Sequence, residues 1–314
     1  MAEKIATRES YGTALVELAE KYDFVVLDAD LAEATKTVKF KKAYPDRFFD
    51  CGIAEGNMMS VAAGIATTGK PVFASSFAMF AAGRAFEQVR NSIGYPHLNV
   101  KIGATHAGIT VGEDGATHQC NEDIALMRTI PGMTIVNPSD AVEAKAAVEA
   151  ALNTNGPFYL RFGRFAVPVI NDTPDYKFEL GKGVLLADGT DVTIVATGLT
   201  VGMALEARET LAGEGISARV INIHTIKPID REILAKAAKE TGAIVTAEEH
   251  NVIGGLGSAV AEVLCEECPV PMLRVGMQDT YGHSGTVPSL LEAYGLTPAV
   301  IAENAKRAIA LKKA

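Results

Sequence analysis

Apolar residues recur along the chain with two alternating periods. A helical period runs from about Arg8 to Tyr22, where Tyr11, Leu15 and Leu18 fall on one face. Short apolar runs typical of buried strands then alternate with further helical segments. The predicted strands are 24–28, 71–74, 100–103, 133–136 and 158–161, with helices near 56–67, 78–92, 121–128 and 139–152. This β–α alternation predicts a largely parallel sheet covered by helices.

The same alternation resumes after an interruption that is polar and contains prolines. Residues 171–184 have the composition of a linker between domains. Beyond it, the predicted strands are 192–196, 218–222, 243–246 and 272–275, with helices at 200–213, 230–241 and 255–266. The sequence therefore predicts the α/β fold class, with two consecutive α/β domains at 1–170 and 185–314, both with mainly parallel sheets.

Composition narrows the class of protein without naming its chemistry. The 314 residues are 48% hydrophobic and 21% charged, with a net charge of −9 and no long acidic run. This balance argues against nucleic acid or an anionic membrane as the main partner. With no signal peptide or long apolar span in the sequence, we expect a cytoplasmic protein.

The four cysteines do not form a disulfide framework or a zinc motif. Cys51 and Cys120 are dispersed, and the Cys265-Glu-Glu-Cys268 pair lies at the end of a helical pattern without a second pair nearby. Gly254-Gly-Leu-Gly257 lacks the full spacing of a dinucleotide-binding fingerprint. Neither motif predicts a site.

Glu55 is the most informative single residue, because it is a lone carboxylate in the small and apolar run 51–66. Burying a carboxylate is unfavourable, and a desolvated carboxyl group holds or shares a proton more readily than one in water. Glu55 is therefore a candidate functional acid. The alternative is a helix-start glutamate that the helix dipole stabilises.

A second candidate region is the stretch from Thr105 to Gln119, which glycines break into short pieces. It concentrates His106, Glu113, Asp114 and His118, and loops of this kind carry binding and catalytic residues. A lone loop histidine is more commonly structural. Several polar residues in one loop favour a site.

Taken in order, these features resemble one family. A buried glutamate, the aromatic segment Ser75-Ser-Phe-Ala-Met-Phe80, His106 and then Gly-Glu-Asp-Gly-Ala-Thr-His118 resemble the pyrimidine-binding domain of the transketolase family. The likeness runs from about Thr7 to Arg164 and continues into the C-terminal region. It implies a thiamin-diphosphate-dependent transketolase, of which this chain is the C-terminal subunit.

The resemblance implies roles around the cofactor. Glu55 would meet a nitrogen of the aminopyrimidine ring, while Phe77 and Phe80 would stack on that ring and Asp30 would lie near it. Considered without the resemblance, an aromatic pair at helical spacing is usually core, and an Asp at a strand end is commonly a cap. A further family aromatic is replaced here by Gly83, so the pocket must differ in detail.

The resemblance also implies a sugar phosphate site. His106, Arg8 and Arg164 would bind the phosphate, and Asp114 and His118 would meet sugar hydroxyls near the reacting carbon. Glu55, His106 and His118 would be the catalytic residues. A guanidinium fork matches the geometry of a phosphate better than a lysine does.

Two departures from the family pattern qualify the substrate and the assembly. Ala34 stands where the family has a serine that assists phosphate binding, so a different sugar class is an open alternative. The Gly-Asp-Gly motif that binds the divalent metal and the diphosphate in the family does not occur in these residues. We therefore expect a separate N-terminal subunit to supply Mg²⁺, or another divalent metal, and the diphosphate site, in an α2β2 heterotetramer.

Three alternatives remain at this stage. Deoxyxylulose-phosphate synthase is similar around residues 248–257 and 130–133, but its loop usually has Arg at the position of His106 and lacks the inserted Glu113. The β subunit of a 2-oxoacid dehydrogenase shares the fold and the glutamate but does not need His106 and His118. A non-catalytic scaffold would not need to retain Glu55 and Asp114.

Overall fold

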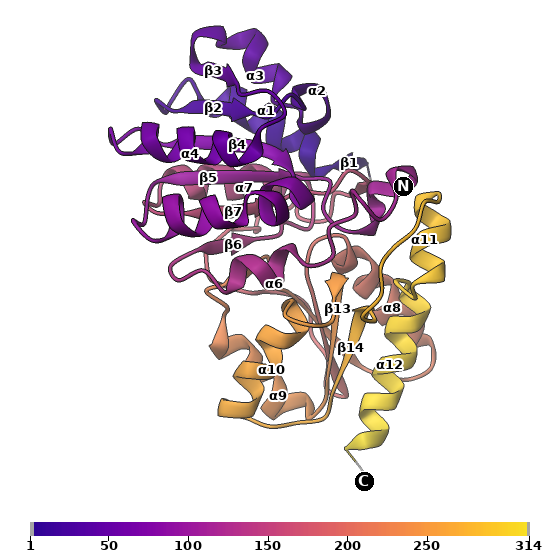
Figure 1. Ribbon diagram of the computed structural model, residues 1–314. Coiled ribbons are helices and arrows are strands. Elements are labelled where there is room, and N and C mark those ends of the chain that lie inside the picture. The colour runs from indigo at the N-terminus through magenta and orange to yellow at the C-terminus, as the bar shows by residue number, and fades with distance from the viewer. Residues whose placement is uncertain (1–2, 313–314) are drawn as a thin grey trace.

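The computed structural model describes residues 3–312, and its strands form two main sheets (Figure 1). In the N-terminal domain, the strand order is β12-β6-β7-β5-β4-β2-β3, and all neighbours are parallel except β12 and β6. The strands are β2 (Val25–Asp28), β3 (Phe48–Asp50), β4 (Val72–Phe77), β5 (Val100–Thr105), β6 (Thr134–Val136), β7 (Phe158–Arg161) and β12 (Thr225–Lys227). The predicted parallel sheet is confirmed.

Helices cover both faces of this sheet because its strands are apolar on both sides. One face packs against α1 (Thr7–Leu18), α3 (Val38–Ala43) and α7 (Ala141–Leu152). The other packs against α4 (Glu55–Ala66), η2 (Met79–Arg84), α5 (Phe86–Gln88), η3 (Val89–Gly94) and α6 (Asp123–Arg128). The short segments α2 (Ala32–Thr35), η1 (Pro45–Arg47) and η4 (Ile109–Asp114) lie in the connections.

The C-terminal domain repeats this layering on a smaller sheet, ordered β14-β13-β10-β11-β9. Its strands are β9 (Val184–Ala187), β10 (Val192–Ala196), β11 (Ala218–Asn222), β13 (Ile244–Asn251) and β14 (Met272–Met277). The helices α8 (Thr200–Gly213), α11 (Val287–Ala293) and α12 (Pro298–Leu311) pack on one face, and α9 (Arg231–Thr241) and α10 (Leu256–Glu267) on the other. Only β9 pairs antiparallel within this sheet.

Two strand pairings that the sequence pattern does not predict tie the segments together. Strand β12 follows β11 along the chain but adds to the edge of the N-terminal sheet, antiparallel to β6. Strand β1 (Lys4–Ala6) pairs with β8 (Ala166–Pro168) at the start of the connector. Each of these strands has three residues or fewer in its pairing, which is too short for a hydrophobic period to reveal.

Two predicted helices differ from the structure. The first ends at Leu18 and not at Tyr22, because the chain turns toward β2. The segment 78–92 is helical, but π turns interrupt it, as where the Ala85 N–H donates to the Phe80 carbonyl five residues earlier at 3.2 Å. Such π turns are frequent at functional sites.

Candidate active site

The predicted site residues gather at the carboxyl ends of neighbouring parallel strands. Phe77 ends β4 and lies in register with Thr105, which ends β5, and His106 follows directly. Strand β7 ends at Arg161, three residues before Arg164. In open parallel sheets this edge is where ligands bind. The fold thus brings together residues that are far apart in sequence.

Glu55 begins α4, and its side chain is 1% exposed. Arg84 Nη1 donates to its two carboxylate oxygens at 2.9 and 3.1 Å, and the Arg84 side chain is 54% exposed. The Arg84 guanidinium carbon also lies 4.5 Å from the centre of the Phe80 ring. The Arg84 guanidinium, a flat group with N–H donors, therefore covers the Phe80 ring and hydrogen-bonds to Glu55.

Four rings form a continuous cluster beside this pair. Phe77 stacks on His106 with ring centres 3.8 Å apart, and it lies parallel to Phe80 at 5.9 Å. The His118 ring meets Phe80 edge-on at 5.3 Å. His106 thus lies against the face of Phe77, while His118 lies edge-on to both phenylalanine rings.

The other side of His106 faces cations. Arg8 Nη1 lies 2.9 Å from His106 Nε2 and donates to the Ala34 carbonyl at 3.0 Å. Burial, followed by the charges of Arg8 and Arg164, lowers the pKa of His106 to about 3. Burial, partly opposed by Glu9, lowers the pKa of Arg8, and the Arg164 charge adds to this lowering. Neutral His106 and two neighbouring guanidinium groups form a region that favours an anion.

The loop after His106 presents the remaining polar residues. Asp114 ends η4 and is exposed, while His118 is half-buried with its Nδ1 2.9 Å from the Thr117 hydroxyl. Arg164 Nη1 donates to the Val111 carbonyl and pairs with Glu113 at 3.5 Å. Arg164 therefore holds the loop as well as facing the site.

Asp30 is a predicted site residue that lies away from the ring cluster in its described contacts. It is exposed at the end of β2 in a left-handed conformation with φ 61°, and its backbone N–H donates to Asp50 at 3.2 Å. Within residues 3–312, no hydrogen bond or ion pair joins its side chain to the other predicted site residues. Its role remains a prediction.

The structure explains how the pocket differs at Gly83. A Cβ at this position would collide with the terminal methyl group of Met79, so a larger side chain here would require that methyl group to move. Sequence reasoning also missed Arg84 and Lys36. Arg84 follows Gly83 and could have been found from its place on the predicted helix, but its pairing with Glu55 is a contact between two separate helical segments. Lys36, whose charge also acts on His106, has no sequence signal.

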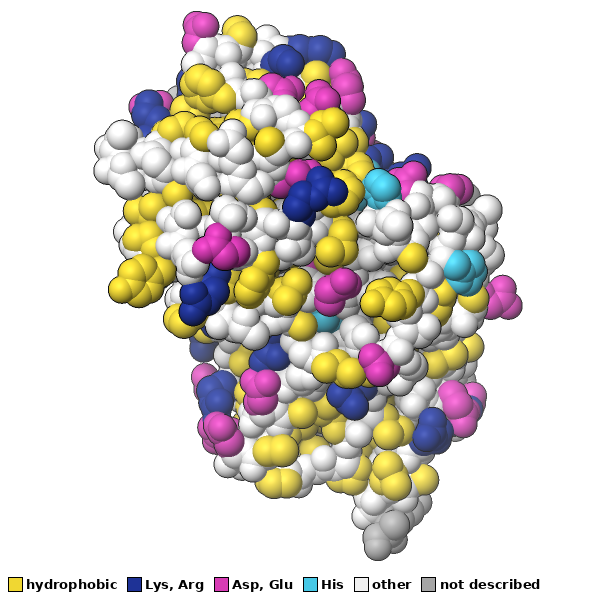
Figure 2. Space-filling view, viewed as in Figure 1, with side chains coloured by type: hydrophobic (Ala, Val, Ile, Leu, Met, Phe, Trp, Pro, Cys, Tyr) yellow, Lys and Arg dark blue, Asp and Glu magenta, His cyan; other side chains and the backbone are white. Residues whose placement is uncertain are grey.

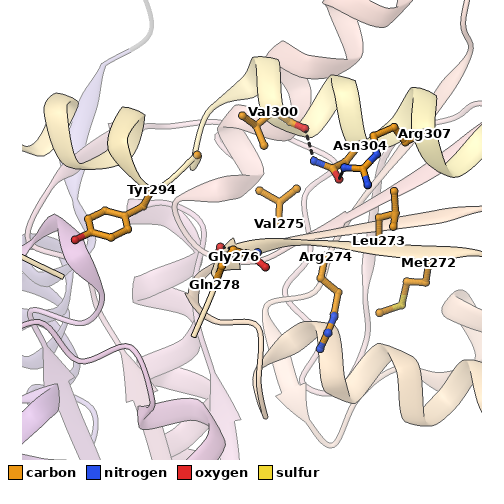
Figure 3. Close-up of a pocket in the computed structure, with 11 residues that line it drawn as sticks. Met272, Leu273, Arg274, Val275, Gly276, Gln278, Tyr294, Val300, Asn304 and Arg307 are labelled. Atoms are coloured by element: carbon orange, nitrogen blue, oxygen red, sulfur yellow. Dashed lines mark hydrogen bonds between the residues drawn. The ribbon is translucent and has the colours of Figure 1, made fainter. Parts of the chain in front are cut away.

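A cleft of about 800 Å³ opens next to Phe80 and Arg84, where the N-terminal domain meets the C-terminal segment 279–281. The face drawn in Figure 2 carries many hydrophobic side chains over the N-terminal domain. Another cavity, of about 480 Å³, lies along the edge strand β14 beside α12, and Arg274, Asn304 and Arg307 line it (Figure 3). It contains none of the predicted site residues.

Two further features concern metals and membranes. In the part of the chain that the structure describes, no group of three or more His, Cys, Asp or Glu side chains is arranged to hold a metal ion. Within residues 3–312, no helix has both the length and the hydrophobicity needed to cross a bilayer.

Comparison with known proteins identifies both domains. The family model described as "Transketolase, pyrimidine binding domain" matches residues 3–169, and "Transketolase, C-terminal domain" matches residues 181–301. A solved structure described as "Split gene transketolase, inactive beta4 tetramer" is 54% identical and superposes with a TM-score of 0.90 over 99% of this chain and 100% of that chain.

Curated relatives give the same answer. The "Putative transketolase C-terminal section" of Methanocaldococcus jannaschii is 51% identical over 94% of both chains. A "6-deoxy-6-sulfo-D-fructose transketolase subunit" of Clostridium sp. is 48% identical over 92% of this chain and 90% of the relative. Human transketolase is 38% identical over 96% of this chain, which spans 49% of the human protein. These relatives favour transketolase over deoxyxylulose-phosphate synthase and the 2-oxoacid dehydrogenase β subunit. The chain belongs to the transketolase family.

Proposed function

We propose that this chain is the C-terminal subunit of a thiamin-diphosphate-dependent transketolase that transfers a two-carbon ketol unit between sugar phosphates. The observation that carries the proposal is the Glu55 site. A buried carboxylate there has a half-exposed, exchangeable partner in Arg84, next to the face of Phe80. The proposed domains are 1–170 and 185–314, joined by the linker 171–184.

The residues fit the aminopyrimidine end of thiamin diphosphate. The Arg84 guanidinium is flat, donates N–H groups to Glu55 and covers Phe80, which are the contacts that an aminopyrimidine would make. When bound, the cofactor supplies the carbon that carries the two-carbon unit. Glu55 would hold a proton at a ring nitrogen, and Phe80, with Phe77 behind it, would orient the ring. Asp30 would lie nearer the rim of this site.

The sugar would bind on the other side of the ring cluster. His106, Arg8 and Arg164 would bind its anionic end, because the two guanidinium groups are charged donors. The Nε2 of neutral His106 accepts from Arg8 in this structure, and it would donate to the anion in the other tautomer. Asp114 and His118 would meet hydroxyl groups, and His118, whose ring meets Phe80 edge-on, would move a proton at the reacting carbon. Similar chains are described as subunits for 6-deoxy-6-sulfo-D-fructose and apulose-4-phosphate, so the anionic end group differs among relatives.

The diphosphate and Mg²⁺ would be held by a separate N-terminal subunit in an α2β2 assembly. Three exposed hydrophobic residues flank the Glu55 site, and a partner could bury them: Phe49 is 46% exposed, Ile53 76% and Val61 38%. The structure of the similar split transketolase chain is described as an "inactive beta4 tetramer". We place the assembled enzyme in the cytoplasm, within carbohydrate metabolism of the pentose phosphate type.

The test is reconstitution. The chain would be mixed with a chain that carries Gly-Asp-Gly, together with magnesium and thiamin diphosphate, and ketol transfer and cofactor binding would be measured. We expect activity and tight cofactor binding from the mixture and neither from this chain alone. Full activity from this chain by itself would refute the two-subunit site.

A further inference from the structure

The loop that carries Asp114 and His118 has little regular structure to hold it in place. It bends at Gly108, Gly112 and Gly115, which have φ of 79°, 85° and 75°. Its one helical segment, η4, contains a kink at Gly112. Because glycines allow many backbone conformations, contacts from outside the loop help to set its position.

One of those contacts comes from the C-terminal domain. Glu249 lies on β13, is 4% exposed, and accepts a hydrogen bond from the Thr110 N–H at 2.7 Å. A side chain at Gly108 would collide with the Glu249 carboxylate. The loop backbone therefore passes closely around this carboxylate at the start of η4.

The Glu249 position is itself held firmly. Arg161 Nη2 donates to the Glu249 carbonyl at 2.9 Å, and Arg161 Nε donates to Asp123 at 2.8 Å. Burial raises the pKa of Glu249, and Arg161 and the Thr110 N–H oppose this rise. A buried carboxylate with so few partners is unfavourable unless each hydrogen bond is kept.

A second contact joins the same loop to the same domain. Gln119 Nε2 donates to the carbonyl of His283 at 3.0 Å, and to the carbonyls of Ile109 and Gly112 at 3.3 Å. Both ends of the loop are thus tied to the C-terminal domain.

We propose that Glu249 is a positioning residue, whose carboxylate sets the backbone that presents Asp114 and His118 to the sugar. This inference rests on the proposed function. Glu249 acts through Thr110, whose N–H donates to its carboxylate. Through Glu249, the C-terminal domain takes part in substrate binding, although Glu249 itself contacts neither substrate nor cofactor.

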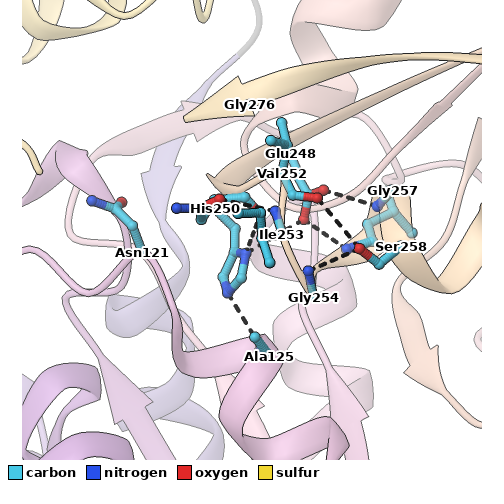
Figure 4. Close-up of polar contacts among 12 residues, drawn as sticks. Asn121, Ala125, Glu248, His250, Val252, Ile253, Gly254, Gly257, Ser258 and Gly276 are labelled. Carbon is cyan, nitrogen blue, oxygen red and sulfur yellow. Dashed lines mark hydrogen bonds and ion pairs between the residues drawn. The ribbon is translucent and has the colours of Figure 1, made fainter. Parts of the chain in front are cut away.

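The neighbouring residue provides a matched control. Glu248 is also buried, but its two oxygens accept from the N–H groups of Leu256 and Gly257 at 2.6 and 2.8 Å, at the start of α10 (Figure 4). It caps a helix within its own domain. Losing it should lower stability and leave the site loop in place.

The experiment compares Glu249→Ala, Glu249→Gln and Glu248→Ala in the reconstituted two-subunit enzyme. Glu249→Ala leaves the buried Thr110 N–H unpaired, so we expect the sugar KM to rise roughly ten- to 100-fold while cofactor affinity stays within about twofold. The glutamine retains an acceptor oxygen and should stay within about threefold of the parent KM. Glu248→Ala should lower the melting temperature and leave KM unchanged.

A second readout uses this chain alone. Amide hydrogen exchange at residues 108–119 should accelerate in Glu249→Ala and not in Glu248→Ala. Equal KM values for the two alanine variants, or a loss of cofactor affinity that matches the loss of sugar affinity, would overturn the inference. If the parent mixture shows no ketol transfer, the proposed function fails, and unchanged exchange in Glu249→Ala would separately refute the positioning contact.

Discussion

Two carboxylate–guanidinium pairs in the N-terminal domain have nearly the same length but opposite surroundings. Asp123 and Arg161 meet at 2.8 Å, with side chains 0% and 3% exposed, and the Tyr159 hydroxyl donates to the same carboxylate at 2.8 Å. Glu55 and Arg84 meet at 2.9 Å, with side chains 1% and 54% exposed. Only the second pair can open toward solvent.

The difference separates a structural role from a functional one. Although burial acts to raise it, Arg161 and then His250 hold the pKa of Asp123 below its usual value. That pair is enclosed by both domains and cannot change partners without exposing a buried charge. Glu55 can exchange Arg84 for another planar donor, because Arg84 is half in water. A buried carboxylate thus indicates a site when its partner can leave.

The largest expected effect tests the open pair. Glu55→Gln should lower the turnover of the reconstituted enzyme by roughly a hundred- to ten-thousand-fold, because it removes a positioned acid. The fold should remain intact, as judged by circular dichroism. Glu17→Gln, whose side chain is 48% exposed, is the control. Turnover above half the parent value in Glu55→Gln would show that the assignment is wrong.

The next prediction compares the two pairs directly by urea unfolding of this chain. Arg161→Met should cost about 3–5 kcal/mol, because Asp123 would stay buried and unpaired. Arg84→Met should cost about 1 kcal/mol or less, since its removal admits water to Glu55. Equal losses of unfolding free energy would contradict the distinction between a closed and an open pair.

The anion site offers a smaller effect. Arg164→Ala should raise the KM of phosphorylated sugars by roughly ten- to 150-fold, the equivalent of about 1.5–3 kcal/mol for a charged hydrogen bond. The KM of unphosphorylated sugars should rise much less, because they lose only the contact of Arg164 with the loop. Arg208→Ala, on α8 and paired with Glu209, is the control. The same rise for both sugar classes would exclude a phosphate contact.

The smallest expected effect is that folded His106 does not titrate between pH 8 and pH 5. Burial, then Arg8 and Arg164, lowers the pKa of His106 to about 3, so its ring resonances in NMR should not move between pH 8 and pH 5. An unfolded histidine has a pKa of about 6.5 and takes up its proton earlier. The unfolding free energy should therefore decline as the pH falls from about 6.5 toward 3. A midpoint above pH 5 for His106 would contradict the buried, cation-facing environment.

His250 is a buried histidine beside the closed pair of Asp123 and Arg161. Burial lowers the pKa of His250 to about 4, while burial raises that of Glu248 to about 7, and the two side chains lie 3.8 Å apart. Below pH 6.5, His250 lowers the unfolding free energy as the pH falls. Glu248 raises the unfolding free energy as the pH falls from about 7 toward the pKa of a glutamate in the unfolded chain. The contributions of His250 and Glu248 to the unfolding free energy therefore oppose each other, as expected for residues with a structural role.

Hydrophobic periodicity alone was sufficient for most of the regular elements. The predicted strand 158–161 matches β7, and the predicted helix 200–213 matches α8. Helix α12 was missed, although Thr297 and Pro298 at its start and the spacing of Ile301, Ala305 and Ala308 were a readable signal. Glu55 also stood out, since a lone charge in an apolar run is visible without a structure.

What the sequence by itself determined is therefore which segments form helices and strands, which of their faces are buried, and which charged residues are out of place. The tertiary structure alone decided which of those residues meet. Arg84 reaches Glu55 across 29 positions, Arg161 reaches Asp123 across 38, and Glu249 reaches Thr110 across 139. Periodicity records how one segment faces the core, but a pairing between distant segments depends on strand order and packing, which no local pattern contains.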